Sequence, residues 1–156
     1  MTQDANVTTE EPTPISDPSD FKILIVDDER VVLEGCRLVL QSEGYEVALV
    51  SSSDFALKII EEINPSLLLV DLKMPGHDGM YLLKEVKKHR PDIPIIVMSG
   101  YATLETIEEV SAQRADAFIP KPFTPDELLE KIRQVSNGET RHKKKKGSHN
   151  NRDHRL

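Results

Sequence analysis

The sequence predicts an α/β fold in which helices cover both faces of a five-stranded parallel sheet, giving three α/β/α layers. Residues 21–138 alternate five short apolar runs with five helical patterns. Repeated strand–helix units imply a parallel sheet with right-handed crossovers. Three of the runs are almost continuously apolar, which is typical of strands buried on both faces. The length of 156 residues and the 38% hydrophobic composition suffice for one such domain with extensions.

The apolar runs supply the predicted strands. They are FKILIV (21–26), YEVALV (45–50), SLLLV (66–70), IPIIVM (93–98) and DAFIP (116–120). The first, third and fourth are the near-continuous ones, so we expect both of their faces to be covered.

The first two helical patterns end at residues that favour a helix stop. The first pattern runs from about residue 29 to 43 and stops at Gly44, a residue type suited to the left-handed position after a helix. Its apolar stripe consists of Val32, Cys36, Val39 and Leu40. The second pattern, 53–63, starts from a serine-rich cap and ends before Asn64 and Pro65, because the residue before a proline resists the helical conformation.

The remaining helical patterns carry their own end signals. The third, 79–89, finishes on a basic cluster, KKH, which suits a helix C-terminus. The fourth spans about residues 104–113. The fifth opens with Thr124 as a cap, Pro125 in the first helical position and Glu127 completing a capping box.

Charge divides the chain into three parts. Residues 1–20 contain five acids and no Lys or Arg, whereas residues 139–156 contain seven Lys or Arg and two acids. Both segments lack large apolar side chains, so we predict a disordered acidic N-terminal extension and a disordered basic C-terminal tail around a domain at 21–138. The domain itself carries a charge of −7, which argues against nucleic-acid binding by the folded part.

The sequence also predicts a soluble, cytoplasmic protein. The N-terminus has neither the basic nor the apolar region of a secretory signal, and no apolar stretch reaches the length of about 20 residues that a membrane span requires. The one cysteine, Cys36, excludes an intrachain disulfide and is expected to be a small buried hydrophobe.

Polar side chains gather where the predicted strands end: Asp27, Asp28, Asp71, Ser99 and Lys121. The carboxyl ends of parallel strands meet at one edge, where such sheets bind ligands. Three carboxylates there would repel one another by about 4 kcal/mol per close pair at an effective dielectric of about 20, so they require a cation. Oxygen ligands suit Mg²⁺, and a metal with a lysine would attract a phosphoryl group that a carboxylate could accept. Taken singly, Asp28 could merely cap the first helix and Ser99 could be an ordinary turn residue.

Four segments together carry a family resemblance: IVDD, VDLKMPGHDG, MSGYAT and FIPKPF. Their order and spacing resemble the receiver domain of bacterial two-component response regulators over residues 21–138. The resemblance implies a flavodoxin-like receiver fold with strand order 2-1-3-4-5. It also implies a phosphoprotein that works in two-component or phosphorelay signal transduction.

The resemblance assigns roles to the acidic residues. Asp71 would be the phosphoacceptor. Asp28 and Asp71 would bind Mg²⁺ directly, together with the backbone carbonyl of Lys73, and Asp27 would assist, often through water. Mn²⁺ is a possible substitute for the metal.

The resemblance also implies a switch. Lys121 would pair with the phosphoryl oxygens, and its bond to Pro122 would be cis. Ser99 would reach toward the phosphoryl group, and Phe118 would be the switch aromatic, turning inward to fill the vacated space. The resulting change would appear at the face formed by the fourth helix, the fifth strand and the fifth helix.

These roles predict a single-domain response regulator that catalyses its own phosphorylation and dephosphorylation. A sensor histidine kinase, a histidine phosphotransfer protein or a small acyl phosphate would supply the phosphoryl group, and a downstream protein would read the result. We expect no output domain, because fewer than the roughly 60 residues that such a domain needs follow the fifth helix. A phosphate-independent receiver-like interaction module is the alternative.

Three positions depart from the commonest family pattern or vary within it. Arg114 stands where the family often has glycine, at a turn where a left-handed backbone would cost an arginine of order 1 kcal/mol. Lys73 and Tyr101, each two residues past a functional side chain, are expected to tune the lifetime of the phosphate. His77 is expected to be a solvent-exposed turn residue.

Other functions fit the sequence less well. A flavodoxin-like cofactor binder needs small phosphate-cradling residues after the first strand, where DDER would repel an anion. A haloacid-dehalogenase-like phosphatase needs an aspartate two residues past the nucleophile, where Lys73 stands. The basic tail could contact nucleic acid or an acidic membrane, or it could be a silent solvated segment.

Overall fold

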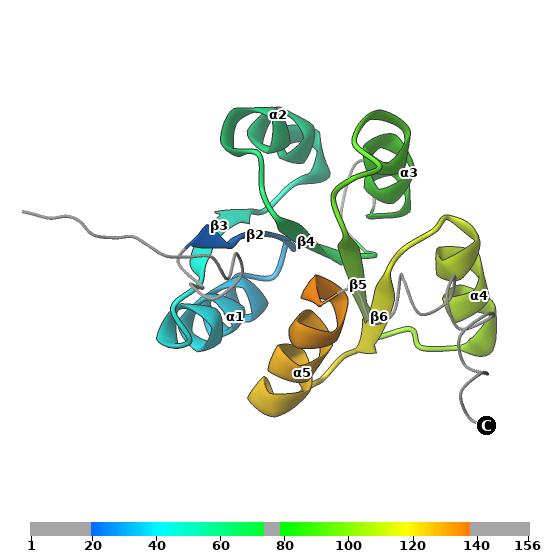
Figure 1. Cartoon of the computed structure of the whole chain (residues 1–156). Helices are drawn as coiled ribbons and strands as arrows, with labels where there is room; N and C mark the ends of the chain where they lie inside the picture. The colour runs from blue at the N-terminus through cyan, green and yellow to red at the C-terminus, as the bar shows by residue number, and fades with distance from the viewer. Residues whose placement is uncertain (1–19, 74–78, 138–156) are drawn as a thin grey trace, which may run out of the picture.

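Five parallel strands form one sheet in the order β3-β2-β4-β5-β6 (Figure 1). The computed structural model describes residues 20–73 and 79–137. The strands are β2 (Lys22–Val26), β3 (Glu46–Val50), β4 (Leu67–Asp71), β5 (Ile95–Ser99) and β6 (Ala117–Pro120). Numbered along the chain, this is the order 2-1-3-4-5, and it confirms the predicted topology.

The near-continuous apolar runs are buried on both faces, as predicted, and they occupy the middle of the sheet. Every residue of β4 and β5 is buried. β2 pairs with both β3 and β4, whereas β3 and β6 form the edges. β5 begins at Ile95, two residues later than the apolar run, although the carbonyl of Pro94 still accepts from the N–H of Leu68.

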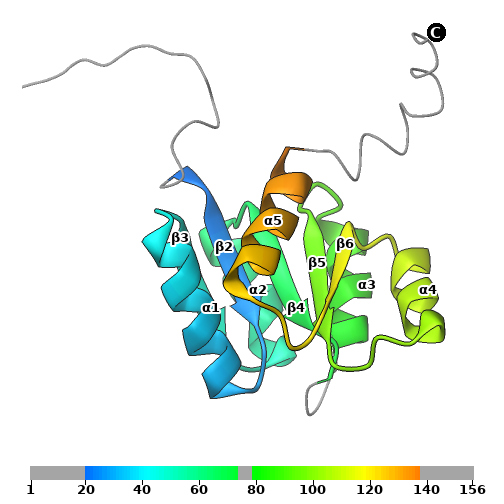
Figure 2. The same ribbon diagram turned by 90° about the horizontal axis from the view of Figure 1, so that it is seen from below.

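Helices cover both faces of the sheet (Figures 1 and 2). α1 (Arg30–Ser42) and α5 (Pro125–Ser136) lie on one face, and α2 (Ser53–Ile63) and α3 (Gly79–His89) lie on the other. α4 (Leu104–Ala112) lies beside β6, and its Val110 joins the core under α2 and α3. Alternate residues of the central strands point into the two cores, so the sheet is apolar on both faces.

The predicted helix ends are mostly confirmed. Thr124 and Glu127 form the capping box of α5, and the Ser52 side chain caps α2 by accepting from the N–H of Asp54. Gly44 has the expected positive φ of 93°. Arg114 has a φ of 69°, so the turn before β6 is left-handed, a conformation that costs a side chain of this type of order 1 kcal/mol.

The start of α1 differs from the predicted pattern. The cap position belongs to Glu29, and its side chain accepts no capping hydrogen bond within the described helix. Asp28 is therefore not the cap of this helix. The buried side of α1 contains Leu33 besides the predicted Cys36 and Leu40, while Val32 and Val39 are only partly buried.

Other sequence-based expectations concern the whole chain. Within residues 20–73 and 79–137, no helix is long and apolar enough to cross a membrane. Cys36 is buried as expected, and burial raises the pKa of its thiol to about 11. The predictions for the acidic extension, the basic tail and His77 concern segments outside the described residues.

Candidate functional site

The carboxyl edge of the sheet brings the predicted polar residues together. Asp27 and Asp28 follow β2, Asp71 is the last residue of β4, Ser99 is the last residue of β5, and Lys121 follows β6. Carboxylate oxygens of Asp27, Asp28 and Asp71 all lie within 4.8 Å of one another. Side chains that are up to 94 positions apart in the chain therefore form one site, because parallel strands end at a common edge.

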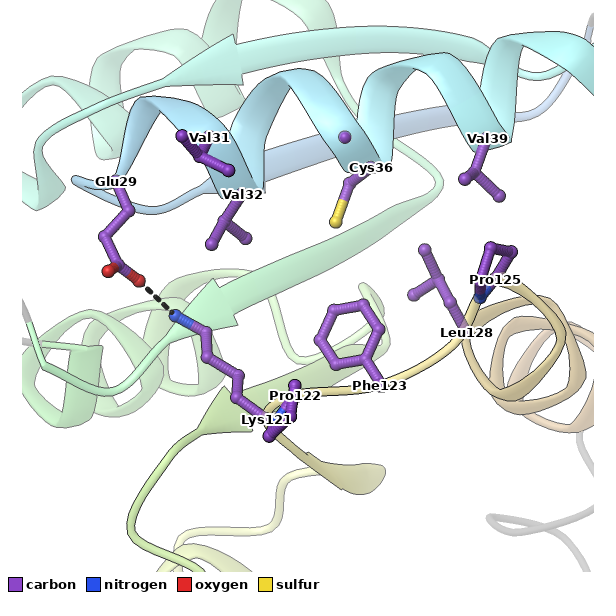
Figure 3. A pocket seen from close by; sticks show the side chains of 11 residues that line it. Glu29, Val31, Val32, Cys36, Val39, Lys121, Pro122, Phe123, Pro125 and Leu128 are labelled. Atoms are coloured by element: carbon purple, nitrogen blue, oxygen red, sulfur yellow. Dashed lines mark hydrogen bonds and ion pairs between the residues drawn. The ribbon is translucent and has the colours of Figure 1, made fainter.

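Lys121 connects the carboxylates of this edge. Its Nζ donates to Asp27 Oδ2 at 2.9 Å and to Asp71 Oδ1 at 3.1 Å. A third hydrogen bond, of 3.1 Å, goes to Glu29 Oε1 (Figure 3). An ammonium group has three N–H donors, so these three carboxylates use its full capacity.

Burial makes the negative charge of the site costly. Asp27 is fully buried, and Asp71 is 4% exposed. Burial and, next, the charge of Asp27 raise the pKa of Asp71 to about 6, against the opposing effect of Lys121. Burial also raises the pKa of Asp27. Burial alone would lower the pKa of Lys121, but its bonds to Asp27 and the nearby carboxylates raise it above the usual range.

The loop after β5 completes the edge. The Ser99 side chain is buried, and its Oγ accepts a hydrogen bond of 2.9 Å from the backbone N–H of Tyr101. The Lys73 ammonium lies 4.6 Å from the centroid of the exposed Tyr101 ring, within the range of a cation–π interaction. The loops after β4 and β5 are thus joined next to Asp71.

The geometry of this edge agrees with the comparison of the sequence with known families. Residues 23–133 match the response regulator receiver domain. The chain belongs to this family. Its sheet order, acidic cluster and lysine are those that the sequence resemblance led us to expect.

Relatives of this receiver domain occur alone and within larger proteins. The chain is 34% identical over 113 residues to sporulation initiation phosphotransferase F of Bacillus subtilis, an alignment that covers 72% of this chain and 91% of the relative. It is 36% identical to the regulatory protein AtoC of Escherichia coli, over 69% of this chain but 23% of AtoC. The chain therefore spans only about a quarter of AtoC, and about half of the response regulator MprA of Mycobacterium leprae.

Solved structures of receivers show the same fold. The CheY-like receiver domain protein of Methanospirillum hungatei superposes with a TM-score of 0.72 at 38% identity, covering 77% of this chain and 95% of that one. The chemotaxis protein CheY4 of Vibrio cholerae gives a TM-score of 0.71 at 27% identity, over 74% and 98% of the two chains.

The donor set of this receiver fits a divalent cation. Receiver domains bind Mg²⁺ at an acidic pocket, and the three clustered carboxylates here supply only hard oxygen ligands. Two of the three are buried with raised pKa values, so a cation would relieve a real electrostatic cost.

Two other predicted features of the receiver are placed by the structure. The Lys121–Pro122 bond is cis, as expected. Phe118 lies in β6 opposite Val97 and is partly buried against the core that contains Val110 of α4. Phe118 is therefore beside the α4 region rather than at the carboxylate edge.

Two residues of the site, Gly79 and Glu29, were not predicted from the sequence. Gly79 begins α3 and donates its N–H to the carbonyl of Leu72, and a Cβ at this position would lie 2.7 Å from the Cα of Leu72. Only glycine fits so close to the backbone that follows Asp71. Glu29 is the second missed residue. Its only indication in the sequence was that a glutamate stands at a helix cap position, where shorter polar side chains are preferred.

Proposed function

We propose that this receiver accepts a phosphoryl group on Asp71, with Mg²⁺ present, and signals through a change at the face formed by α4, β6 and α5. The observation that carries the proposal is the position of Lys121, whose Nζ bonds both Asp71 and Asp27 at the carboxyl edge of the sheet. A partly exposed ammonium group beside a buried carboxylate provides both a nucleophile and an attractive charge for phosphoryl oxygens.

The reaction follows from the chemistry of a carboxylate nucleophile. An oxygen of ionised Asp71 attacks phosphorus, forming a new P–O bond. The bond to the donor breaks, a P–N bond in a phosphohistidine or a P–O bond in a small acyl phosphate, and its electron pair leaves with the donor. Lys121 keeps Asp71 close to a positive charge and can pair with the phosphoryl oxygens.

The metal would be held by Asp27, Asp28 and Asp71, together with the backbone carbonyl of Lys73. When bound, Mg²⁺ would neutralise the charge that gathers on the phosphoryl oxygens. Mn²⁺ is a possible substitute because it also favours oxygen ligands.

Hydrolysis of the acyl phosphate would return the receiver to its starting state. This step needs water to reach phosphorus, and the Lys73–Tyr101 pair stands next to Asp71. We infer that these two side chains set the lifetime of the phosphate by controlling the approach of water. The receiver would thus promote its own phosphorylation and dephosphorylation.

The signal would travel from Ser99 to Phe118. A phosphoryl group on Asp71 would draw the Ser99 hydroxyl away from the N–H of Tyr101, its partner at 2.9 Å. The partly buried Phe118 ring would then turn inward beside α4. A downstream protein would distinguish the two arrangements of the α4, β6 and α5 face.

The proposed phosphodonor is a sensor histidine kinase or a histidine phosphotransfer protein. Receiver domains interact with such proteins, and the relatives include sporulation initiation phosphotransferase F and the sensor kinase CckA of Brucella abortus. The net charge of −7 over residues 21–138 supports a function without nucleic-acid binding by the domain. The cytoplasmic location and a contact by the basic tail stay predictions.

Intact mass spectrometry after incubation with acetyl phosphate and Mg²⁺ tests this function. We expect the wild type to gain one phosphoryl group, and we expect Asp71→Asn to fold but gain none. Phosphorylation of the variant would reassign the acceptor. A folded wild type that gains nothing, even from a histidine phosphotransfer protein, would favour a phosphate-independent interaction module.

A further inference from the structure

We propose that, in the unmodified receiver, the Glu29 carboxylate accepts the Lys121 hydrogen bond that a phosphoryl oxygen accepts after phosphorylation. Phosphorylation would therefore displace Glu29 from Lys121. The inference rests on the proposed function and adds a positioning residue to it. Glu29 would act through Lys121 and would set how readily the site accepts a phosphoryl group.

Lys121 uses its full donor capacity in the unmodified receiver. Its three N–H donors are engaged by Asp27, Asp71 and Glu29, at 2.9, 3.1 and 3.1 Å. A phosphoryl oxygen that is to bond Lys121 must therefore displace one of these carboxylates.

Burial decides which carboxylate leaves. The Asp27 side chain is fully buried, and its other oxygen already accepts a hydrogen bond of 2.9 Å from the N–H of Glu29. Asp71 is buried and itself carries the phosphoryl group. The Glu29 side chain is 62% exposed, so water can replace Lys121 as its partner at little cost. Glu29 is thus the partner that is most easily displaced.

The local structure of α1 supports a role for Glu29 outside the helix. Glu29 occupies the cap position of α1 with an extended backbone, where a side chain would normally accept from the first N–H groups of the helix. Its carboxylate reaches across instead to Lys121, at the start of the segment that leads into α5 (Figure 3). A residue that breaks a local rule in this way marks a site where function competes with helix stability.

A set of three variants separates competition for Lys121 from a simple effect of charge. Glu29→Asp keeps the charge, but its shorter side chain withdraws from Lys121 and can cap α1. Glu29→Gln removes the charge at nearly constant size. Glu62→Gln removes the same charge from the exposed surface of α2, on the opposite face of the sheet, and serves as the control.

The measurement is the affinity of each protein for beryllofluoride, a phosphoryl mimic, with Mg²⁺ by calorimetry. An exposed ion pair of ordinary strength corresponds to a change of about two- to fivefold. We therefore expect Glu29→Asp and Glu29→Gln both to bind about two- to fivefold more tightly than the wild type, with Glu62→Gln unchanged. Glu29→Asp should also melt at the same temperature as the wild type or higher, because aspartate is a better cap.

The outcomes distinguish this inference from the function on which it rests. Tighter binding by Glu29→Gln with no change in Glu29→Asp would show a charge effect alone and would overturn the inference. Equal affinities in the wild type and both variants would overturn it as well. A wild type that binds no beryllofluoride would overturn the proposed function and this inference together.

A second readout needs no phosphoryl group. Acetic anhydride modifies exposed amines, and mass spectrometry of the peptide that contains Lys121 reports its rate of acetylation. Because Glu29 is the solvent-facing partner of Lys121, we expect faster acetylation in Glu29→Asp than in the wild type and no change in Glu62→Gln. An unchanged rate in a folded Glu29→Asp protein would contradict the pairing.

Discussion

Lys87 and Lys121 lie at opposite ends of the strands of the same sheet, and each bonds at least one buried carboxylate. The two sites differ in the number of carboxylates for each lysine. Lys87 of α3 bonds Asp116 at 3.1 Å, and both side chains are less than 10% exposed. The same oxygen of Asp116 accepts from the N–H of Ile95, so the pair fixes the starts of β5 and β6. One lysine meets one aspartate, and the pair is neutral.

At the carboxyl edge, one lysine meets an excess of acid. Lys121 bonds Asp27, Asp71 and Glu29, and Asp28 lies in the same cluster. The negative charge left over can bind a cation, and one of the carboxylates is then free to act as the nucleophile. The comparison indicates that a balanced buried pair supports the fold, whereas an unbalanced one sacrifices stability for binding and chemistry.

Breaking the neutral pair should have the largest effect. Lys87→Met removes one member of the buried Lys87–Asp116 pair, and breaking such a pair typically costs about 3–5 kcal/mol of unfolding free energy. Urea denaturation followed by circular dichroism would measure the loss. Lys88→Met, on the exposed side of α3, is the matched control and should change stability by less than about 0.5 kcal/mol. A loss below about 1 kcal/mol in Lys87→Met would contradict a structural role for the pair.

Replacing Asp71 should raise the free energy of unfolding, whereas breaking the Lys87–Asp116 pair lowers it. The folded-state pKa of about 6 exceeds the usual value of 3.8, so ionising Asp71 costs the folded protein stability as the pH rises from about 4 through 6. In EDTA, we expect Asp71→Asn to be more stable than the wild type by about 1–3 kcal/mol at pH 7.5, with the difference vanishing below about pH 4.

Asp116→Asn, the same substitution at the neutral Lys87–Asp116 pair, tests whether the two sites respond to charge removal in opposite directions. Asp116→Asn removes the partner of the buried Lys87, so it should destabilise the protein at neutral pH while Asp71→Asn stabilises it. Denaturation curves at pH 7.5 for both variants give the comparison. If the two substitutions shift stability in the same direction, the proposed difference in charge balance is wrong.

Adding Mg²⁺ should raise the free energy of unfolding through the carboxylates of the acidic edge and not through acidic residues elsewhere. At ten times its dissociation constant, a cation that binds only the folded state raises the unfolding free energy by about 1.4 kcal/mol. We expect this gain in the wild type and its loss in Asp28→Asn, measured by thermal melts with and without Mg²⁺. Asp92→Asn, just before β5 at the other end of the sheet, is the control and should keep the gain. Stabilisation that survives in Asp28→Asn would place the metal elsewhere.

The residues at the carboxyl edge of the sheet could largely be predicted from the sequence, whereas the Lys87–Asp116 pair at the other end could not. The gathering of Asp27, Asp71, Ser99 and Lys121 follows from alternating strands and helices, since parallel strands end together. The order of the strands was expected from the family resemblance alone. The Lys87 side chain was assigned to a basic cluster at a helix end, and its burial beside Asp116, 29 positions away, had no local signal.

The missed contacts share a physical cause. The bond of Glu29 to Lys121 spans 92 positions, and it depends on how closely α1 approaches the segment before α5. The need for glycine at position 79 likewise depends on the path of the backbone after Asp71. Periodicity and capping rules describe neighbours along the chain, so they locate elements well and contacts between distant loops poorly.

The smallest expected effect concerns the exposed rim of the site. Lys73→Ala removes the cation–π contact with Tyr101, and we expect the dephosphorylation rate to change by about two- to fivefold, as befits an exposed interaction of up to about 1 kcal/mol. The decay of phosphorylated protein, followed by intact mass after removal of acetyl phosphate, gives the half-life. Lys84→Ala, on the exposed side of α3, should leave the half-life unchanged. An unchanged half-life in Lys73→Ala would show that its side chain has no part in tuning.

The most direct test of the unbalanced edge is the identity of the residue that carries the phosphoryl group. Borohydride reduces an aspartyl phosphate to homoserine, which peptide mass spectrometry can locate after reaction with acetyl phosphate and Mg²⁺. We predict homoserine at position 71 and at no other carboxylate. Homoserine at position 27 or 28, or a phosphorylated protein in which position 71 is unmodified, would contradict the assignment of Asp71 as the acceptor.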